Sequence, residues 1–176
     1  MKRWGLLLII GGVVVVLVGI FALGNKAPAS NQNAIGQHFA EQERKHIDEG
    51  TKSPVEYNSN PPSSGPHYPQ PAPWGVKDTA EADERYIHNL EHGGVWITYK
   101  PDLAADQLNQ LKAAVSALPP DAQFNEVKIV MSPRAANTSP VSLVAWTYVE
   151  NLDTPDATKI KDFYLNHVDK GPELIP

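Results

Sequence analysis

Two histidines four residues apart are the most chemically informative feature of the sequence. His88 and His92 lie on either side of Glu91, and Gly93-Gly94 follows directly. Side chains four residues apart project in the same direction on a helix and also on an extended strand. Because neutral imidazole is the commonest protein ligand of transition metals, the pair predicts one side of a metal site.

A third imidazole and a thioether could complete such a site. His67 lies in the segment Ser64-Gly-Pro-His-Tyr68, where glycine and proline restrict the backbone and allow close approach. Met131 ends a short predicted strand and is one of only two methionines in the chain. The predicted metal ligands are His67, His88, His92 and Met131. Glu91 would orient an imidazole by accepting its ring N–H. Because a thioether is a soft ligand, this set favours copper, whereas three imidazoles with Glu91 or water would suit zinc.

Two other interpretations of the histidines remain open. Residues 88–92 match the inverted zinc-peptidase pattern His-x-x-Glu-His, in which both histidines bind zinc and Glu91 would be the general base. Those enzymes carry the pattern inside a long helix, and the Gly-Gly that follows here argues against one, so we expect a binding protein rather than an enzyme. In the third interpretation the histidines only hydrogen-bond a proline-rich segment, and the protein is a non-metal accessory subunit of a membrane complex.

The composition excludes several classes of site. The chain contains no cysteine, which excludes Fe–S clusters, thiolate zinc sites and thiol redox chemistry. The formal net charge is −5 and no basic run follows the N-terminal segment, so we expect no nucleic-acid partner. Any metal must therefore be bound by histidine, methionine, carboxylate or backbone groups.

The N-terminal segment predicts a membrane anchor. Trp4 to Gly24 contains no charged residue, and about 20 apolar residues suffice to span a bilayer as a helix. A cleaved secretory signal, with an apolar core of roughly 7–15 residues, is the alternative. Lys2 and Arg3 should stay cytoplasmic, which places the remainder outside the cell membrane. The predicted parts are a single-pass transmembrane anchor at residues 1–24, a tether at 25–34 and an extracytoplasmic metal-binding α+β domain at 35–176.

The first part of this domain combines a charged segment with a proline-rich one. Residues 35–49 are rich in helix formers, which predicts a helix that ends at Gly50. Six prolines follow between Val55 and Gly75. Such a density excludes a helix or a central strand. Because large aromatic residues accompany the prolines, we expect an ordered segment that packs on the surface of the domain. We call this proline-rich segment, Val55 to Gly75, the wrap.

The remainder alternates between strand and helix patterns. Strands are expected at residues 94–99, 127–131 and 141–149, and helices at 102–118 and from Thr154 to about His167. The strand–helix–strand unit should give a parallel pair, and the last two strands an antiparallel hairpin. The predicted fold is a small α+β domain with a mixed β-α-β-β-α sheet, ferredoxin-like or a truncated version of that fold. Its helices would cover one face and the wrap the other.

Three motifs are distinctive beyond these patterns. They are Asn58-Ser-Asn-Pro-Pro-Ser-Ser-Gly-Pro-His-Tyr68, Tyr86-Ile-His-Asn-Leu-Glu-His-Gly-Gly94 and Asp169-Lys-Gly-Pro-Glu173. The chain resembles, on these motifs, a bacterial family of membrane-anchored proteins known as a domain of unknown function. The resemblance extends from about Gly36 to the C-terminus. It implies an N-terminal anchor and an exported domain whose hallmark positions match His67, His88, Glu91 and His92.

The resemblance implies no reaction, so the expected function depends on the ligand argument. We expect a membrane-anchored protein that binds copper and handles it, or delivers it to a membrane-bound enzyme.

Overall fold

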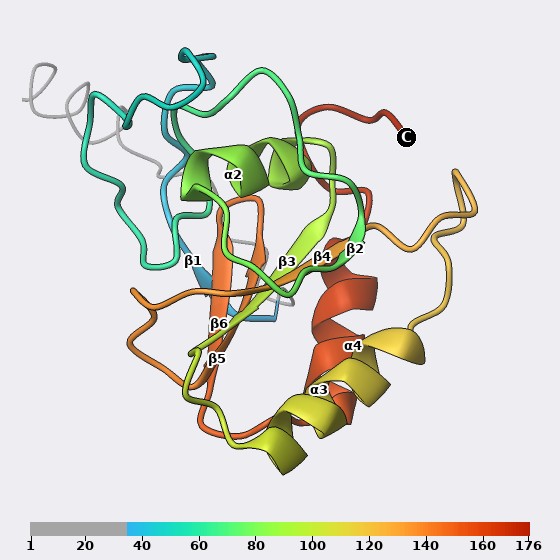
Figure 1. Ribbon diagram of the computed structural model, residues 1–176. Helices are drawn as coiled ribbons and strands as arrows, with labels where there is room; N and C mark the ends of the chain where they lie inside the picture. Colours follow the sequence, from blue (N-terminus) through green and yellow to red (C-terminus); the bar gives the residue numbers. More distant parts are fainter. Residues whose placement is uncertain (1–34) are drawn as a thin grey trace, which may run out of the picture. The chain divides into compact units, whose positions relative to one another are not determined.

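Three strands of buried residues form the centre of the sheet in the computed structural model, which describes residues 35–176 (Figure 1). They are β3 (Val95–Tyr99), β4 (Ile129–Pro133) and β5 (Val141–Ala145). Strand β3 pairs in parallel with β4 and antiparallel with β5. All five residues of β3 are buried, as expected for a strand that is covered on both faces.

Three further strands complete a six-stranded sheet in the order β1-β6-β5-β3-β4-β2. They are β1 (Gln37–His38), β2 (Gly75–Val76) and β6 (Tyr148–Leu152). The two edge strands, β1 and β2, have two residues each. Such short edges offer little unpaired backbone to another chain.

The helices cover both faces of the sheet. They are α2 (Asp83–Glu91), α3 (Ala105–Ser116) and α4 (Ala157–His167). Helices α3 and α4 pack together against one hydrophobic cluster, which contains Ile97 of β3. Helix α2 packs against a second cluster, which contains the adjacent Trp96. Because successive strand residues face opposite sides of a sheet, these clusters mark its two faces, and Figure 1 shows α2 apart from α3 and α4.

Several sequence predictions are confirmed. The fold is mixed α+β, the unit β3-α3-β4 forms a parallel pair, and both α3 and α4 lie inside the predicted helical ranges. None of the helices in the described range is both apolar and long enough to cross a membrane. The predicted anchor at residues 1–24 and the tether at 25–34 lie outside the described residues.

The predicted antiparallel hairpin between the last two strands is wrong. Strands β4 and β5 lie on opposite sides of β3 and do not pair. The apolar run at residues 141–149 is not one strand but two, β5 and the start of β6, which pair with each other. Between them Thr147 has a positive φ of 63°, a left-handed conformation that turns the chain. The turn is not visible as a break in the apolar run of the sequence, because its residue Trp146 is buried as well.

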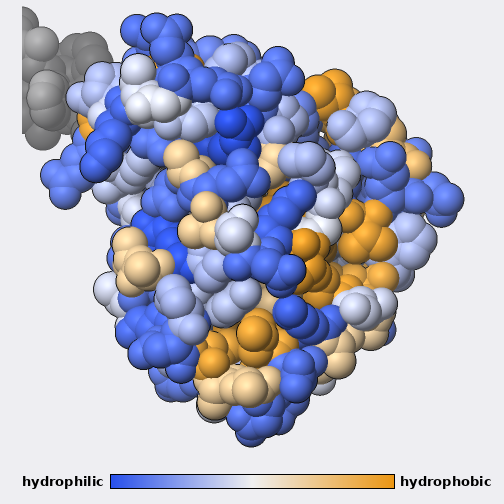
Figure 2. Space-filling model, in the orientation of Figure 1, coloured by the Kyte–Doolittle hydropathy of each residue, from blue (hydrophilic) through white to orange (hydrophobic). Residues whose placement is uncertain are grey.

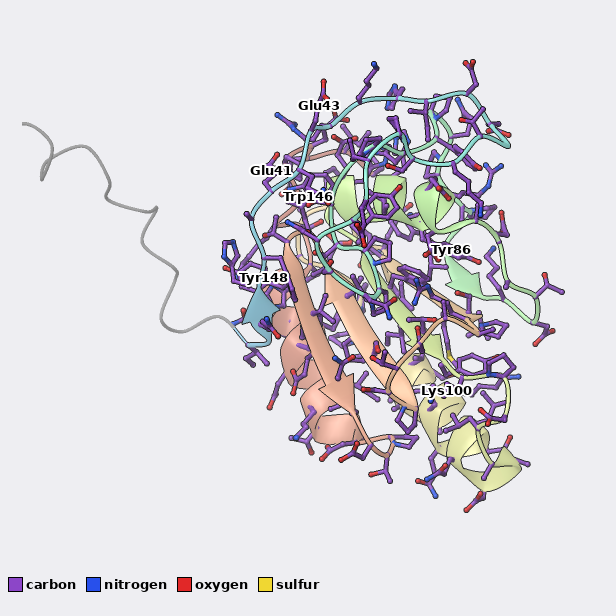
Figure 3. All side chains as sticks on the ribbon, turned by 90° about the vertical axis from the view of Figure 1, so that its left-hand side faces the viewer. Glu41, Glu43, Tyr86, Lys100, Trp146 and Tyr148 are labelled. Atoms are coloured by element: carbon purple, nitrogen blue, oxygen red, sulfur yellow. The ribbon has the colours of Figure 1, made fainter. Side chains whose placement is uncertain are left out.

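The predicted helix at residues 35–49 is also wrong, because the segment is extended. Its start pairs with β6, and Phe39 N donates to Thr147 O at 2.8 Å. Its end runs beside the proline-rich wrap, where Ile47 N donates to His67 O at 2.9 Å. Figure 3 shows this segment, with Glu41 and Glu43 labelled, running along the end of the domain that holds α2. Partners from distant parts of the chain have outweighed local helix propensity.

The proline-rich wrap is ordered, as predicted, and it lies on the same face as α2. Ser63 and Ser64 are fully buried. Asn89 of α2 fixes the wrap through both amide atoms, accepting from Ala72 N at 2.9 Å and donating to Ala72 O at 2.8 Å. The predicted division into helices on one face and wrap on the other is thus only partly correct, because α2 joins the wrap. The surface over these covering segments is mostly hydrophilic (Figure 2).

Candidate metal centre

Helix α2 carries the histidine pair. Asp83 and Glu84 lie in its first turn, where acidic side chains stabilise the helix dipole. Its apolar residues Ile87 and Leu90 are fully buried against the sheet, which leaves His88 directed toward the wrap. The helix ends where Gly93 takes a positive φ of 77°. The pattern therefore does not lie inside a long helix, as expected from the Gly-Gly that follows it: α2 has nine residues and ends at Glu91, with His92 at its C-cap.

The wrap fixes the tautomer of His88. This side chain is buried, and its Nδ1 lies 2.6 Å from the carbonyl oxygen of Tyr68. A carbonyl can only accept, so Nδ1 must carry a proton and donate it. In the neutral ring Nε2 then carries the lone pair, and a backbone carbonyl behind the opposite nitrogen is the usual arrangement for a metal-binding histidine.

His67 repeats this arrangement from the wrap. It is fully buried, and its Nδ1 lies 2.8 Å from Gly65 O. Gly65 has a φ of +122°, and a Cβ there would lie 2.8 Å from the Tyr57 ring, so only glycine fits this turn. The Nε2 atom of His67 lies 3.0 Å from Oε2 of Glu91 but forms no hydrogen bond of good geometry. The lone pair of a neutral His67 would therefore face a carboxylate.

Glu91 is a buried carboxylate that remains ionised. Burial alone raises its pKa, but His67, with smaller contributions from His88 and Arg44, outweighs burial and holds the pKa below its ordinary value. Arg44 is the more distant cation, with Nη1 at 3.9 Å from Oε1 of Glu91. An anionic oxygen and a ring nitrogen at 3.0 Å repel each other unless a proton or a metal ion lies at that nitrogen. Either a proton on His67 Nε2 or a metal ion bound there would satisfy this contact.

His46 is a third member that the sequence did not reveal. A two-residue parallel bridge pairs it with His67, and His67 N donates to Lys45 O at 3.0 Å. The His46 ring centroid lies 5.0 Å from that of His67 and 5.2 Å from that of His88. Unlike the other two rings, His46 is exposed. The predicted helix at residues 35–49 concealed this role, because only the extended backbone observed here pairs His46 with His67.

The three imidazoles come together as one group. His46, His67 and His88 each offer one ring nitrogen, and these three nitrogens lie within 4.8 Å of one another. Two nitrogens bound to one tetrahedral metal at about 2.0–2.1 Å lie about 3.3 Å apart. Because the ring centroids of all three pairs lie 5.0–5.2 Å apart, each of the rings would have to move slightly to reach that spacing around one ion.

His92 lies beside this group, at the C-terminal end of α2. Its Nε2 is 2.9 Å from Nε2 of His88 and 3.7 Å from Oε2 of Glu173. Burial, with a smaller contribution from His88, lowers the pKa of His92 to about 4. Its imidazole is therefore neutral at physiological pH and is able to bind a metal.

The structure does not bring Met131 to the histidines. Met131 is fully buried in the cluster that faces α3 and α4. The adjacent Val130 belongs to the cluster that faces α2. Strand alternation therefore directs the thioether to the opposite side of the sheet from the histidines. Of the predicted ligands, the structure groups His67, His88 and His92 and separates Met131 from them.

The lowered pKa values predict that acid destabilises the metal-free protein. The pKa of His92 falls from an ordinary 6.5 to about 4 on folding, and burial also lowers that of His88. Between these pH values the unfolded chain binds more protons than the folded chain. The free energy of unfolding should thus be fully retained above pH 6.5 and decrease as the pH falls toward 4. Chemical denaturation at pH 7, 5.5 and 4.5 measures this. A His92→Asn variant should show a shallower decrease, and an identical decrease would contradict the assignment.

The fold and the histidine group together define an α+β domain with a candidate metal centre under its wrap. The chain belongs to the family described as Protein of unknown function (DUF3105), which matches residues 46–175. This agrees with the resemblance to a domain of unknown function, and the match includes each of the four clustered histidines. Comparison with curated proteins and with solved structures gave no match.

Proposed function

We propose that the protein is a membrane-anchored extracytoplasmic metal-binding protein whose site is formed by His46, His67 and His88. Its task would be to hold a transition metal ion and to supply it to, or take it from, a membrane-bound enzyme or complex. The location depends on the charge-free segment Trp4 to Gly24 behind Lys2 and Arg3.

The observation that carries this proposal is the paired orientation of two buried imidazoles. Backbone carbonyls hold Nδ1 of both His67 and His88, so Nε2 is the nitrogen that each ring keeps for a metal ion, and ring nitrogens of these two and of the exposed His46 lie within 4.8 Å of one another. The contact between His67 Nε2 and the ionised Glu91 needs a cation. A proton on His67 Nε2 would also satisfy that contact, and the metal titration below separates the two cases.

Copper(II) is the ion that we favour, and zinc is the alternative. The separation of Met131 removes the argument from a soft thioether ligand. Nitrogen ligands nevertheless bind copper(II) more tightly than the other divalent first-row ions. Three imidazoles would also suit zinc, with water in the remaining position.

Glu91 supports the site rather than acting as a general base in this proposal. Its side chain is only 4% exposed, so a peptide substrate could not approach it without displacing the wrap. The carboxylate instead balances the charge of a bound cation and orients His67. This favours a binding protein over a zinc-dependent hydrolase.

Metal titration of the full chain, purified without a histidine tag, tests the proposal. We expect about one copper(II) or zinc(II) ion to bind per chain, with copper(II) displacing zinc(II). The control is His38→Ala, which removes an exposed histidine of β1 and should bind as the wild type does. Failure to take up added Cu(I), Cu(II) or Zn(II) in stoichiometric amounts would refute the proposal, and would favour a structural role for the histidines.

A further inference from the structure

The donor atoms of this region continue beyond the three-histidine group. The series begins at the exposed His46, which borders an open hollow of about 330 Å³, passes His67 and His88, and reaches His92. From His92 it continues to Glu173, whose side chain is 48% exposed. The series thus has an exposed residue at each end, His46 and Glu173, and buried histidines between them.

The C-terminal segment holds Glu173 beside His92. Glu173 N donates to Glu91 O at 2.9 Å, and Asp169 N donates to Gly93 O at 2.9 Å. Between them Gly171 packs so closely that a Cβ there would overlap Glu91 O and Gly93 N. A glycine is thus required where this segment crosses the end of α2. Backbone contacts therefore fix the main chain of Glu173 beside the end of α2, within reach of His92 for its exposed carboxylate.

His88 belongs to both ends of the series. Its Nδ1 donates to Tyr68 O, so Nε2 is the nitrogen that could bind a metal ion, and in the metal-free chain this atom accepts a hydrogen bond from His92 Nε2 at 2.9 Å. One imidazole lone pair can bind only one metal ion at a time. An ion on the side of His46 and His67, and an ion on the side of His92 and Glu173, would therefore exclude each other.

We propose that His88, His92 and Glu173 form a second coordination position, through which a metal ion leaves the three-histidine site toward solvent or an acceptor. This inference rests on the proposed function. Two imidazoles and a carboxylate are ligands for the same copper(II) or zinc(II) ion. Transfer exchanges His46 and His67 for His92 and Glu173 while His88 stays bound, so the ion need not become fully hydrated on the way. The proton on His92 Nε2 moves to Nδ1 of the same ring or to solvent as the ion binds there.

The experiment measures how fast the metal leaves. The full chain is loaded with one equivalent of copper(II) and mixed with excess EDTA, and the absorbance of the complex is followed in a stopped-flow instrument. For His92→Asn and Glu173→Gln we expect release to slow by about tenfold, while the equilibrium affinity stays within about threefold of wild type. The matched controls are His38→Asn and Glu43→Gln, exposed residues that should leave both quantities unchanged.

The direction in which the release rate changes distinguishes a second coordination position from a fourth ligand of the three-histidine site. If His92 were instead a fourth ligand of the inner site, its loss would weaken the affinity and speed the release. That result, or an unchanged release rate in both variants, would overturn the second position but leave the three-histidine site intact. A wild-type chain that binds no metal would overturn both. Glu173→Gln alters an exposed side chain, so it remains informative even if His92→Asn lowers stability.

Discussion

Replacing His88 by alanine is expected to weaken copper(II) binding by more than about 100-fold, because loss of a residue that merely supports a ligand already costs about 10- to 100-fold. His88 is a ligand in both of the proposed coordination positions, and its Nδ1 donates to Tyr68 O of the wrap. Competition titration against a chelator of known affinity measures the change. His67→Ala should act similarly, whereas loss of the exposed His46 should cost less because water can replace its ring.

The controls for this prediction come from the same chain. His38 and His167 are histidines outside the group, and His167 instead contacts Ile35 O at 2.7 Å. His38→Ala should keep wild-type affinity, and circular dichroism and a melting curve should show that His88→Ala remains folded. A folded His88→Ala variant with unchanged affinity would contradict the proposed site.

Replacing Lys128 by methionine is expected to lower the free energy of unfolding by about 3–5 kcal/mol, the typical cost of removing one member of a buried ion pair. Lys128 is fully buried, and its Nζ lies 2.9 Å from Oδ1 of Asp169. It also donates to the carbonyl oxygens of His92 and Ile175, at 3.2 and 2.6 Å. Methionine keeps most of the side-chain volume but leaves these acceptors without a donor. Denaturation by urea measures the loss.

The comparison variant is Lys112→Met. Lys112 is a partly exposed lysine of α3, with Nζ at 3.6 Å from Asp78 Oδ1, so its replacement should change stability by no more than about 0.5 kcal/mol. Adding Asp169→Asn to Lys128→Met should recover part of the loss, because it removes the unpaired charge. Equal effects of Lys128→Met and Lys112→Met would show that the buried lysine does not stabilise the C-terminal segment.

The predictions for His88 and Lys128 concern neighbouring parts of the same region. Lys128 binds the backbone of His92 on one side and the C-terminal segment on the other. The lysine therefore positions the histidine and the segment that carries Glu173 relative to each other. Loss of Lys128 should disturb the second coordination position more than the three-histidine site.

The sequence predicted those elements whose local pattern agrees with their final environment. Strand β3 and helix α3 have clear periodicity, and both form as expected. The segment at residues 35–49 has the composition of a helix, but its backbone pairs with β6 and with the wrap. No local pattern encodes such pairing, because the partners lie far away in the sequence.

The candidate site shows the same limit. His67, His88 and Glu91 could be singled out because unusual local sequences surround them. His46 has no such surroundings, and only the bridge to His67 brings it to the group. Met131 stands out in the sequence only because methionine is rare, and rarity does not show on which face of a strand a side chain lies. Neighbouring strand residues face opposite sides of the sheet, and Met131 faces the side away from the histidines.

X-ray absorption spectroscopy of the copper(II)-loaded full chain tests the central claim most directly. We predict a first shell of nitrogen ligands at about 2.0 Å with the outer-shell scattering of about three imidazoles, and no sulfur at about 2.3 Å. The same spectrum of His67→Ala should lose imidazole scattering. A shell of oxygen with at most one imidazole would contradict a site formed by His46, His67 and His88. A sulfur contribution would contradict it as well, because the described residues contain sulfur only in Met131, on the other side of the sheet.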